Sequence, residues 1–360
     1  MEEFDCRVKI VSGAGAVSKL ADFGAGRLFV VTDPFFYKNG MAQQVAAASK
    51  AESVEFFHDV RPDPTVELAA EGTAKLKAFG ADLIVALGGG SAMDCAKAMA
   101  FFAKEDTQLV AIPTTSGSGS EVTDFAILTH NKVKHPLVDK RLQPCMAILD
   151  SDFLQDMPAS LIAESGFDVL THAVEAYVAT DAGAFSDMFA QEAFRSAYGA
   201  LPASFAGRKE VRLKVHQAAT MAGMAFTEAG LGLCHAMAHA LGGMFHVAHG
   251  KLNAILLPSV VATNAHVAGA KYAQLARECG MGGTAEAIAV RNLRNNLIRL
   301  RRELKLPETL AQAGIAPGAL RSGMNEIVKA TLADPCCKTN PLKTEDFMIR
   351  RILEEVTGRV

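Results

Sequence analysis

The pattern of strand-like and helix-like segments changes once along the chain, and this change constrains the fold most. Over the first 150 residues, short apolar or β-branched runs alternate with segments of helical spacing; examples are residues 27–32, 82–87, 109–112 and 146–150. The run after Asp82 is continuously apolar, which is typical of a strand covered on both faces. Strands that alternate with helices predict a parallel, doubly wound sheet.

From Pro158 onward, the strand-like runs give way to long segments rich in Ala, Leu and Met that keep a helical period. A chain of 360 residues is long enough for two domains with their own cores. We therefore expect an α/β domain over residues 1–157 and an all-α domain over residues 158–360.

Charge and composition exclude several classes of function. The net charge is −3, so no electrostatic attraction to nucleic acid or to an anionic membrane is expected. The first residues are acidic and hold no apolar signal core, and no apolar run is judged long enough to span a bilayer. The seven cysteines are scattered and lack Cys-x-x-Cys spacing, which argues against a zinc knuckle or a disulfide framework. The sequence predicts a reduced, cytoplasmic enzyme.

In the segment 234–250, four of the ten histidines fall in a stretch of fifteen residues, at positions 235, 239, 246 and 249. A metal ion is the simplest reason to gather imidazoles in this way, because neutral imidazole is the commonest protein ligand for transition metals. His235 and His239 are four residues apart, so on a helix they share one face. Asp168 and His172 repeat this spacing, so two helices could each present a pair of ligands to one ion.

The spacing alone leaves a second interpretation open. A single His-x-x-x-His pair is as compatible with hydrogen-bonded core histidines as with ligands, and an Asp-x-x-x-His pair is weaker evidence. The neighbouring residues of the histidine-rich segment are Ala, Met, Leu, Gly and Phe, which predict a buried helix. Because buried imidazoles need partners, this setting favours a metal site.

Two glycine-rich turns follow predicted strands of the N-terminal half. The first is Gly88-Gly89-Gly90-Ser91, between a buried strand and a helix, and the second is the segment 114–120. Glycines let a backbone approach a phosphate closely, and ligands of such sheets bind at the carboxyl ends of strands. Taken alone, the glycine triplet is explained equally well by a tight strand-to-helix turn. Asp33 follows another strand, where a carboxylate would bond a ribose hydroxyl and repel a 2′-phosphate, favouring NAD; a simple Asp-Pro turn is the alternative.

These segments, in this order, resemble the iron-dependent (group III) alcohol dehydrogenases. The resemblance rests on four segments: Gly88–Asp94, Ile112–Thr123, Asp168–Glu175 and His235–Gly250. It covers nearly the whole chain. Within the family, the segments Ile112–Thr123, Met146–Asp150 and Met221–Ala238 are most similar to the 1-propanol dehydrogenases of propanediol-utilisation microcompartments.

The resemblance implies a dehydroquinate-synthase-like fold: an α/β N-terminal dinucleotide-binding domain and an all-α C-terminal metal-binding and substrate domain. It implies that the four metal ligands are Asp168, His172, His235 and His249, with Fe²⁺ as the ion and Zn²⁺ as an alternative that suits the same donors. It gives His239 the place of a non-ligand active-site histidine, and it puts Phe226 and Cys336 in the substrate pocket. His246 matches no family position and is expected to be structural.

The resemblance also implies a set of NAD-binding residues in the N-terminal half. These are Asp33, Gly88, Gly89, Gly90, Ser91, Asp94, Thr114, Thr115, Ser118, Thr123 and Lys134. The expected reaction is reversible hydride transfer between NAD(H) and a short-chain primary alcohol or aldehyde, with propanol/propanal or ethanol/acetaldehyde as substrates. His239 is our candidate for moving the hydroxyl proton toward solvent.

Other functions remain open at this stage. A polyol dehydrogenase of the glycerol type, or a lyase of the dehydroquinate-synthase type, would also keep a glycine-rich turn and a metal. The lyase needs a basic cluster for carboxylate and phosphate groups, and Lys251 is the only base near the histidines. A catalytically silent, metal-stabilised binding protein would be indicated by a lost ligand, yet all four are present. A homodimer or higher homo-oligomer is expected, with microcompartment shell proteins or enzymes as further partners.

Overall fold

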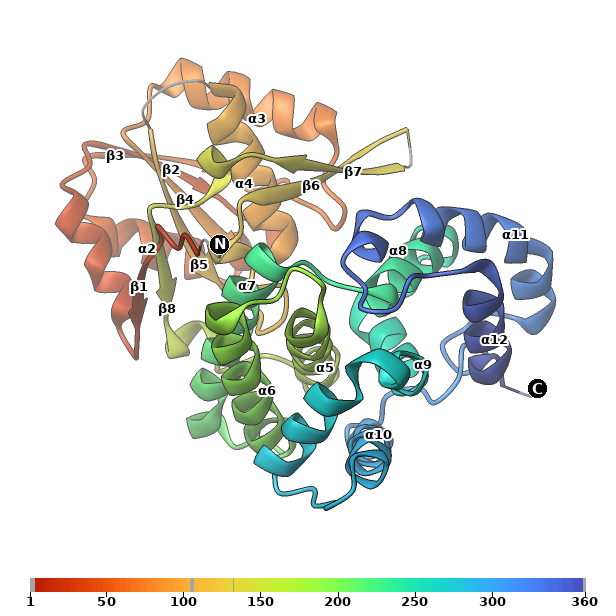
Figure 1. Ribbon diagram of the computed structural model, residues 1–360. Coiled ribbons are helices and arrows are strands. Elements are labelled where there is room, and N and C mark those ends of the chain that lie inside the picture. Colours follow the sequence, from red (N-terminus) through yellow and green to blue (C-terminus); the bar gives the residue numbers. More distant parts are fainter. Residues whose placement is uncertain (1–3, 104–106, 132, 359–360) are drawn as a thin grey trace. The chain divides into compact units, whose positions relative to one another are not determined.

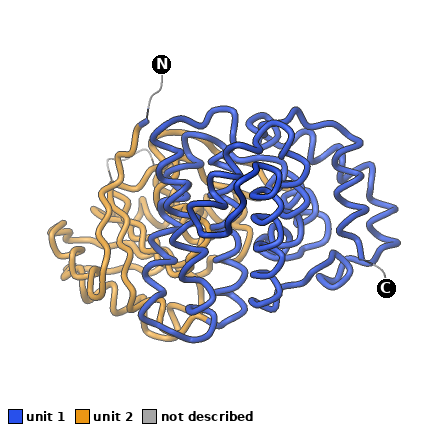
Figure 2. The backbone as a smooth tube through the Cα atoms, turned by 60° about the horizontal axis from the view of Figure 1, so that its bottom comes forward, with its two compact units in different colours: residues 1–4, 158–360 blue, residues 5–157 orange. Residues whose placement is uncertain are grey.

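The computed structural model describes residues 4–103, 107–131 and 133–358 (Figure 1). The chain divides into two compact units (Figure 2). The N-terminal unit comprises Asp5–Met157, and the C-terminal unit runs from Pro158 onward and includes Phe4. Phe4 contacts the latter through Phe185 and Phe189, with ring centroids 5.8 and 5.5 Å away.

The N-terminal unit is built on a six-stranded parallel sheet with the order β1-β8-β5-β4-β2-β3. Its strands are β1 (Lys9–Ser12), β2 (Arg27–Val31), β3 (Ser53–Phe57), β4 (Leu83–Gly88), β5 (Gln108–Pro113) and β8 (Met146–Leu149). A separate antiparallel pair is formed by β6 (Phe125–His130) and β7 (Val133–Val138). The helical elements are η1 (Ala16–Phe23), α1 (Pro34–Lys38), α2 (Met41–Ser49), α3 (Val66–Phe79), α4 (Gly90–Ala103), η2 (Ser120–Val122), η3 (Lys140–Leu142) and η4 (Ser151–Leu154).

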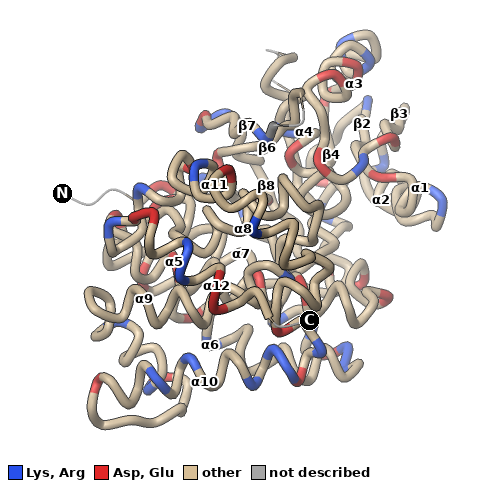
Figure 3. Tube along the Cα trace, turned by 90° about the vertical axis from the view of Figure 1, so that its right-hand side faces the viewer, with Lys and Arg blue, Asp and Glu red and all other residues tan. Residues whose placement is uncertain are grey.

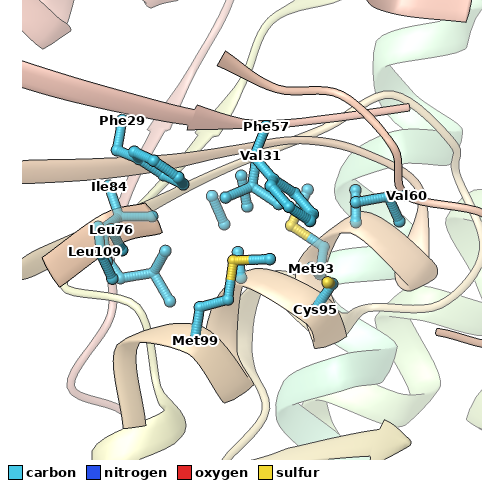
Figure 4. Close-up of a cluster of buried hydrophobic side chains, with 14 of the residues drawn as sticks. Phe29, Val31, Phe57, Val60, Leu76, Ile84, Met93, Cys95, Met99 and Leu109 are labelled. Carbon is cyan, nitrogen blue, oxygen red and sulfur yellow. The ribbon is translucent and has the colours of Figure 1, made fainter. Parts of the chain in front are cut away.

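Alternate residues of the central strands bury two separate cores, one on each face of the sheet. Phe29 and Val31 of β2 pack with Leu76 of α3 and Met93 and Met99 of α4 (Figure 4). The intervening residues of the same strand belong to the opposite core, which η1 and α2 cover. This two-sided burial explains why the central strands are continuously apolar in sequence.

The C-terminal unit is helical, and none of its described residues forms a strand. Its elements are α5 (Ala159–Val178), α6 (Ala184–Phe205), η5 (Lys209–Val211), α7 (Arg212–Ala229), α8 (Leu233–Phe245), α9 (His249–Glu278), α10 (Glu286–Glu303), α11 (Pro317–Ala333), η6 (Pro335–Lys338) and α12 (Asp346–Val356). Lys and Arg are frequent along α10 (Figure 3), while its Leu293, Leu297 and Leu300 are buried. This is the amphipathic pattern of a helix with one solvated basic face.

Helix α9 corrects one expectation from the sequence. Its 30 residues are long and apolar enough to cross a membrane by length and composition alone, whereas no such run was expected. However, 72% of its apolar window is buried inside the structure, as in the core helix of a globular protein. Its apolar character is therefore accounted for by packing within the C-terminal unit.

Candidate metal centre and cofactor loops

Three of the four predicted metal ligands converge in the C-terminal unit. Asp168 lies in α5, His235 in the first turn of α8, and His249 is the first residue of α9. One ligand atom from each of the three side chains lies within 4.8 Å of the others. Residues distant in sequence thus present one carboxylate and two imidazoles to one point, a donor set that suits a divalent transition metal.

The amide of Asn253 lies between these groups. Its Nδ2 donates to Asp168 Oδ1 at 2.6 Å and lies 3.1 Å from His249 Nδ1 and 3.3 Å from His235 Nε2. His249 Nδ1 also lies 3.0 Å from Asp168 Oδ1, so polar atoms from three helices crowd together at this point. His249 Nε2 is also buried without a hydrogen-bond partner among the described residues. Both observations fit a cation at this point.

The fourth predicted ligand, His172, lies beside the three but outside their 4.8 Å cluster. Its ring stacks on that of His235, with centroids 4.5 Å apart. The His172 ring also stacks on the ring of Phe226, with centroids 4.6 Å apart. The structure therefore brings the predicted pocket residue Phe226 against a predicted ligand.

Glu175 is a residue of this centre that the sequence analysis did not assign. It lies on α5, and its carboxylate accepts hydrogen bonds from the backbone N–H groups of Gly232, Cys234 and His235, at 3.0, 2.6 and 3.2 Å. The Nδ1 of His235 donates to Glu175 Oε2 at 2.6 Å, which turns Nε2 toward Asp168. One carboxylate thereby caps α8 and orients a ligand, as carboxylate–histidine–metal triads do.

Gly232 is required by this close approach. A Cβ at this position would lie 2.8 Å from Glu175 Oε1 and 2.9 Å from Asn340 Oδ1. The signal that could have revealed Glu175 is its i+3 spacing from His172, which places it on the ligand-bearing side of α5. Asn253 has a comparable signal, since it lies one turn after His249.

The charge states of the centre suit metal binding. Burial raises the pKa of Asp168, but His172 and His249 outweigh it and hold the pKa at about 2, so the carboxylate is ionised. Burial holds the pKa of His235 well below its usual value, helped by its neighbouring histidines, so the ring is neutral. Burial raises the pKa of Glu175 to about 7, against the lowering effect of its backbone N–H donors. An ionised carboxylate and a neutral imidazole are the metal-binding forms of Asp168 and His235.

His239, the predicted catalytic residue, lies next to this centre without joining the three-residue cluster. Its ring centroid is 5.2 Å from that of His249 and 6.1 Å from that of His235. Its Nδ1 lies 2.9 Å from Asp334 Oδ2, and 29% of its side chain is exposed. Cys336 is the other predicted pocket residue. Its Sγ lies within 4.8 Å of a ligand atom of His239 and of Asp334. His246 instead ends α8 in a left-handed conformation with φ of 54°, consistent with a structural role.

In the N-terminal unit, the predicted cofactor residues gather at the carboxyl ends of three neighbouring strands. Asp33 follows β2, Gly88 ends β4 and Thr114 follows β5. The backbone N–H of Thr114 donates to Gly88 O at 2.9 Å. A Cβ on Gly89 would lie 3.2 Å from Thr115 Oγ1, so the two glycine-rich turns are in close contact.

This edge has the features that a dinucleotide phosphate needs. Gly88 has a φ of 150°, and a Cβ there would lie 2.7 Å from the Cβ of Ala92, so only glycine fits. Helix α4 begins at Gly90 and includes Ser91, so the N–H groups of its first turn lie at this edge. Thr114 Oγ1 is buried without a hydrogen-bond partner among the described residues, which leaves it for a ligand.

The structure shows Asp33 as the cap of a turn. Its Oδ1 accepts hydrogen bonds from the N–H groups of Phe35 and Phe36, at 2.8 and 3.1 Å, and so caps α1. Its Oδ2 lies toward Gly88, 3.9 Å from where a Cβ would be. One oxygen thus fixes the turn that begins α1, while the other lies beside the first glycine-rich turn.

Other predicted cofactor residues are engaged within the protein. Asp94 is partly buried and accepts from Ser120 Oγ at 2.9 Å and from Ile127 N at 3.2 Å. Thr123 accepts from the buried Lys97 Nζ at 2.8 Å, and Ser118 Oγ accepts from Ser120 N at 3.3 Å. These contacts shape the second turn from within.

Lys134, also predicted to bind the cofactor, lies on β7 and pairs with Asp63 at 2.7 Å on the surface of the N-terminal unit. The buried Lys97, which was not predicted, also donates to Ser120 Oγ and to the carbonyls of Thr123 and Phe125. Together with Asp94, it links α4 to Ser120 at the end of the second turn.

Comparison with known proteins identifies the class that this combination of sheet, turns and metal centre defines. Residues 8–151 match the family model described as iron-containing alcohol dehydrogenase, and residues 162–357 match its C-terminal model. The 1-propanol dehydrogenase PduQ of Salmonella typhimurium is 37% identical, covering 99% of this chain and all of the relative. The NADPH-dependent butanol dehydrogenase of Clostridium saccharobutylicum is 33% identical, covering 98% and 97%.

Among solved structures, the sulfoacetaldehyde reductase from Bifidobacterium kashiwanohense in complex with NAD⁺ has a TM-score of 0.91 and 25% identity, covering 99% of both chains. The chain belongs to the iron-containing alcohol dehydrogenase family. The predictions of this family, of its fold and of alcohol dehydrogenase activity are confirmed.

Proposed function

We propose that this chain is a metal-dependent, NAD-linked dehydrogenase of short-chain primary alcohols, acting on propanol/propanal or ethanol/acetaldehyde. The observation that carries the proposal is the convergence of Asp168, His235 and His249 on one point in a member of the iron-containing family. The domain predicted over residues 1–157 would bind NAD(H), and the domain predicted over residues 158–360 would bind the metal and the substrate.

In this proposal Asp168, His172, His235 and His249 hold an Fe²⁺ or Zn²⁺ ion. The ion would supply polarisation of the alcohol or carbonyl oxygen, which lowers the pKa of the alcohol. Glu175 keeps the His235 ring in the tautomer whose Nε2 is free to bind, and Phe226 packs against His172. Stacking of this kind limits rotation of the ligand ring.

His239 would move the substrate hydroxyl proton. The Asp334 carboxylate, 2.9 Å from its Nδ1, fixes the ring and stabilises it when it carries the proton. The exposed fraction of His239 lets the proton pass on to water. In aldehyde reduction the same pair would deliver the proton.

For the cofactor, we propose that the first turn (88–91) and Thr114, Thr115 and Ser118 hold the dinucleotide phosphates and nicotinamide half, with Asp33 at the ribose. Preference for NAD(H) over NADP(H) rests on the Asp33 carboxylate, because a 2′-phosphate would be repelled there. Asp94 and Thr123 would act by shaping the second turn, and Lys134 by its charge. One relative is NADPH-dependent, so the cofactor choice needs a direct measurement.

We also propose a cytoplasmic homodimer or higher homo-oligomer that works inside a bacterial microcompartment, where aldehyde reduction would regenerate NAD. The support is the similarity to 1-propanol dehydrogenases named PduQ, over the full length of both chains. Encapsulation with shell proteins or partner enzymes would be tested by co-purification.

The test is anaerobic purification with metal analysis, followed by a nicotinamide-absorbance assay with alcohols and aldehydes. We expect about one divalent ion per chain and NADH oxidation with propanal or acetaldehyde. Faster reaction with glycerol than with propanol would indicate a polyol dehydrogenase. No turnover by a metal-loaded protein on any substrate would indicate a silent, metal-stabilised protein.

A further inference from the structure

A second group of metal-binding side chains lies beside the first and shares no residue with it. It consists of His239, at the middle of α8, and Asp334 and Cys336, at the junction of α11 and η6. One nitrogen, one carboxylate oxygen and one sulfur lie within 4.8 Å of one another. All three residues are partly exposed, so a solvated ion could reach them.

We propose that His239, Asp334 and Cys336 form a second site for a soft divalent cation, with Zn²⁺ as the ion that fits, and that its occupation inhibits the enzyme. Three protein ligands of the types N, O and S, with a water as the fourth, form a common zinc arrangement. The thiolate distinguishes this site from the first one, whose donors are a carboxylate and imidazoles. Thiolates select Zn²⁺ over harder ions, and Zn²⁺ also binds more tightly than Fe²⁺ by the Irving–Williams order.

The local structure already holds two of the three donors in place. Asp334 Oδ1 accepts the backbone N–H of Cys336 at 2.9 Å, so the carboxylate and the cysteine are fixed relative to each other. The other oxygen, Oδ2, faces His239 Nδ1 at 2.9 Å, where an ion would replace the shared proton. Little rearrangement is needed to bring the donors to bonding distance.

Electrostatics permits a second ion so close to the first. Zn²⁺ with one carboxylate and one thiolate carries no net charge, so its repulsion from a neighbouring cation is weak. The Cys336 proton leaves to solvent as the thiolate binds.

The inhibition part of this inference rests on the proposed function. In that function, His239 moves the substrate proton with Asp334 as its partner. An ion bound to both would remove the pair from proton transfer, and turnover would fall while the first ion stays bound.

The adjacent cysteine provides a matched control. Cys337 donates its thiol to Thr331 O at 3.0 Å and does not belong to the cluster of His239, Asp334 and Cys336. Cys337→Ser therefore removes a neighbouring thiol of the same segment without touching the proposed site. We expect it to keep wild-type activity.

The test uses the enzyme holding one equivalent of Zn²⁺, titrated anaerobically with Co²⁺. Binding of Co²⁺ to Cys336 should produce a thiolate-to-metal charge-transfer absorption, which the thiolate-free first site cannot give. Wild type and Cys337→Ser should show this band at one further equivalent. Cys336→Ser should lose it, and Asp334→Asn should keep a weakened band with lower affinity. Loss of the thiolate should weaken binding of the second ion by more than the 10- to 100-fold that an outer-shell partner contributes.

Absence of the band in wild type, or its persistence in Cys336→Ser, would overturn the proposal. Added Zn²⁺ should lower aldehyde reduction by wild type and Cys337→Ser, but not the residual rate of Cys336→Ser. Circular dichroism checks that each variant is folded. If Cys336→Ser does not fold, the weakened band and lower affinity expected of Asp334→Asn still test the site. A Cys336-dependent band in a protein that reduces no aldehyde would support the second metal site and refute the proposed function. Aldehyde reduction without the band would support the proposed function and refute the second site.

Discussion

Gly250→Ala tests whether the contact between α5 and α9 sets the geometry of the metal centre. Gly250 follows the ligand His249 and packs directly on the backbone of α5, one turn before Asp168. A Cβ at this position would lie 2.1 Å from the carbonyl oxygen of Glu164 and 2.6 Å from its carbonyl carbon. These are backbone atoms of a helix, so no side-chain rotation relieves the overlap.

The expected displacement can be worked out from these distances. The two helices would have to separate locally by about 1.3 Å, the difference between 2.1 Å and the 3.4 Å at which ordinary contact begins. Metal–ligand distances tolerate only about 0.2 Å. Overpacking of this kind costs about 1–3 kcal/mol of folding stability, against at most about 1 kcal/mol gained from helix propensity. We therefore expect the variant to lose stability and most of its affinity for the ion.

Metal affinity measured by chelator competition, together with urea denaturation, checks this. Gly243→Ala is the matched control, because it lies in α8 of the same unit and its added Cβ meets nothing within 4 Å. That variant should bind the ion normally and gain about 0.5–1 kcal/mol. If Gly250→Ala binds the ion as tightly as wild type, the approach of α5 and α9 does not set the ligand geometry and the reasoning is wrong.

Four other predictions follow from the site. Asp33→Gly should raise NADP(H) efficiency relative to NAD(H); equal use of both cofactors by wild type would count against the assignment. His239→Ala should keep its ion and lose turnover by about 10²–10⁴-fold, as general acid–base groups do. Glu175→Gln should weaken metal affinity by about 10–100-fold, whereas Asp150→Asn, which removes a backbone-capping carboxylate of the N-terminal unit, should not. Burial lowers the pKa of Lys97 from 10.5 to about 8, so the folded state releases this proton first and the contribution of Lys97 to stability grows as pH rises from about 8 to 10.5. Urea denaturation across this pH range should show the unfolding free energy of wild type rising relative to that of Lys97→Met.

Burial decided which strands could be predicted. The strands β2, β4, β5 and β8 were predicted within a residue or two because both of their faces are covered and their sequences are apolar, apart from Arg27 and Gln108 at the starts of β2 and β5. The two edge strands, β1 and β3, were missed. Residues 53–57 of β3 are only partly buried apart from Phe57, so polar residues interrupt the pattern. The hairpin β6–β7 was missed for the same reason, since it lies outside the main sheet.

Local spacing found the metal ligands better than it found their supports. Asp168, His235 and His249 belong to recognisable motifs, and helical spacing alone placed Asp168 and His172 on one face. Spacing alone also paired His235 with His239 as ligands. Only the family resemblance replaced His239 with His249, and the structure does group His249 with Asp168 and His235.

Glu175 shows why the rest of the centre could not be predicted. Helical spacing places Glu175 on the ligand-bearing side of α5, but its function depends on four hydrogen bonds to residues 57 to 60 positions away, which spacing does not encode. The Glu175 carboxylate accepts the N–H groups at the start of α8 and also sets the tautomer of His235. Helix capping and ligand orientation therefore depend on the same side chain. Glu175→Gln keeps one acceptor oxygen, which can serve Gly232 N and His235 Nδ1, and puts a donor where Oε1 accepts from Cys234 N. It therefore weakens both the cap and the ligand orientation, but by less than Glu175→Ala, which removes both oxygens.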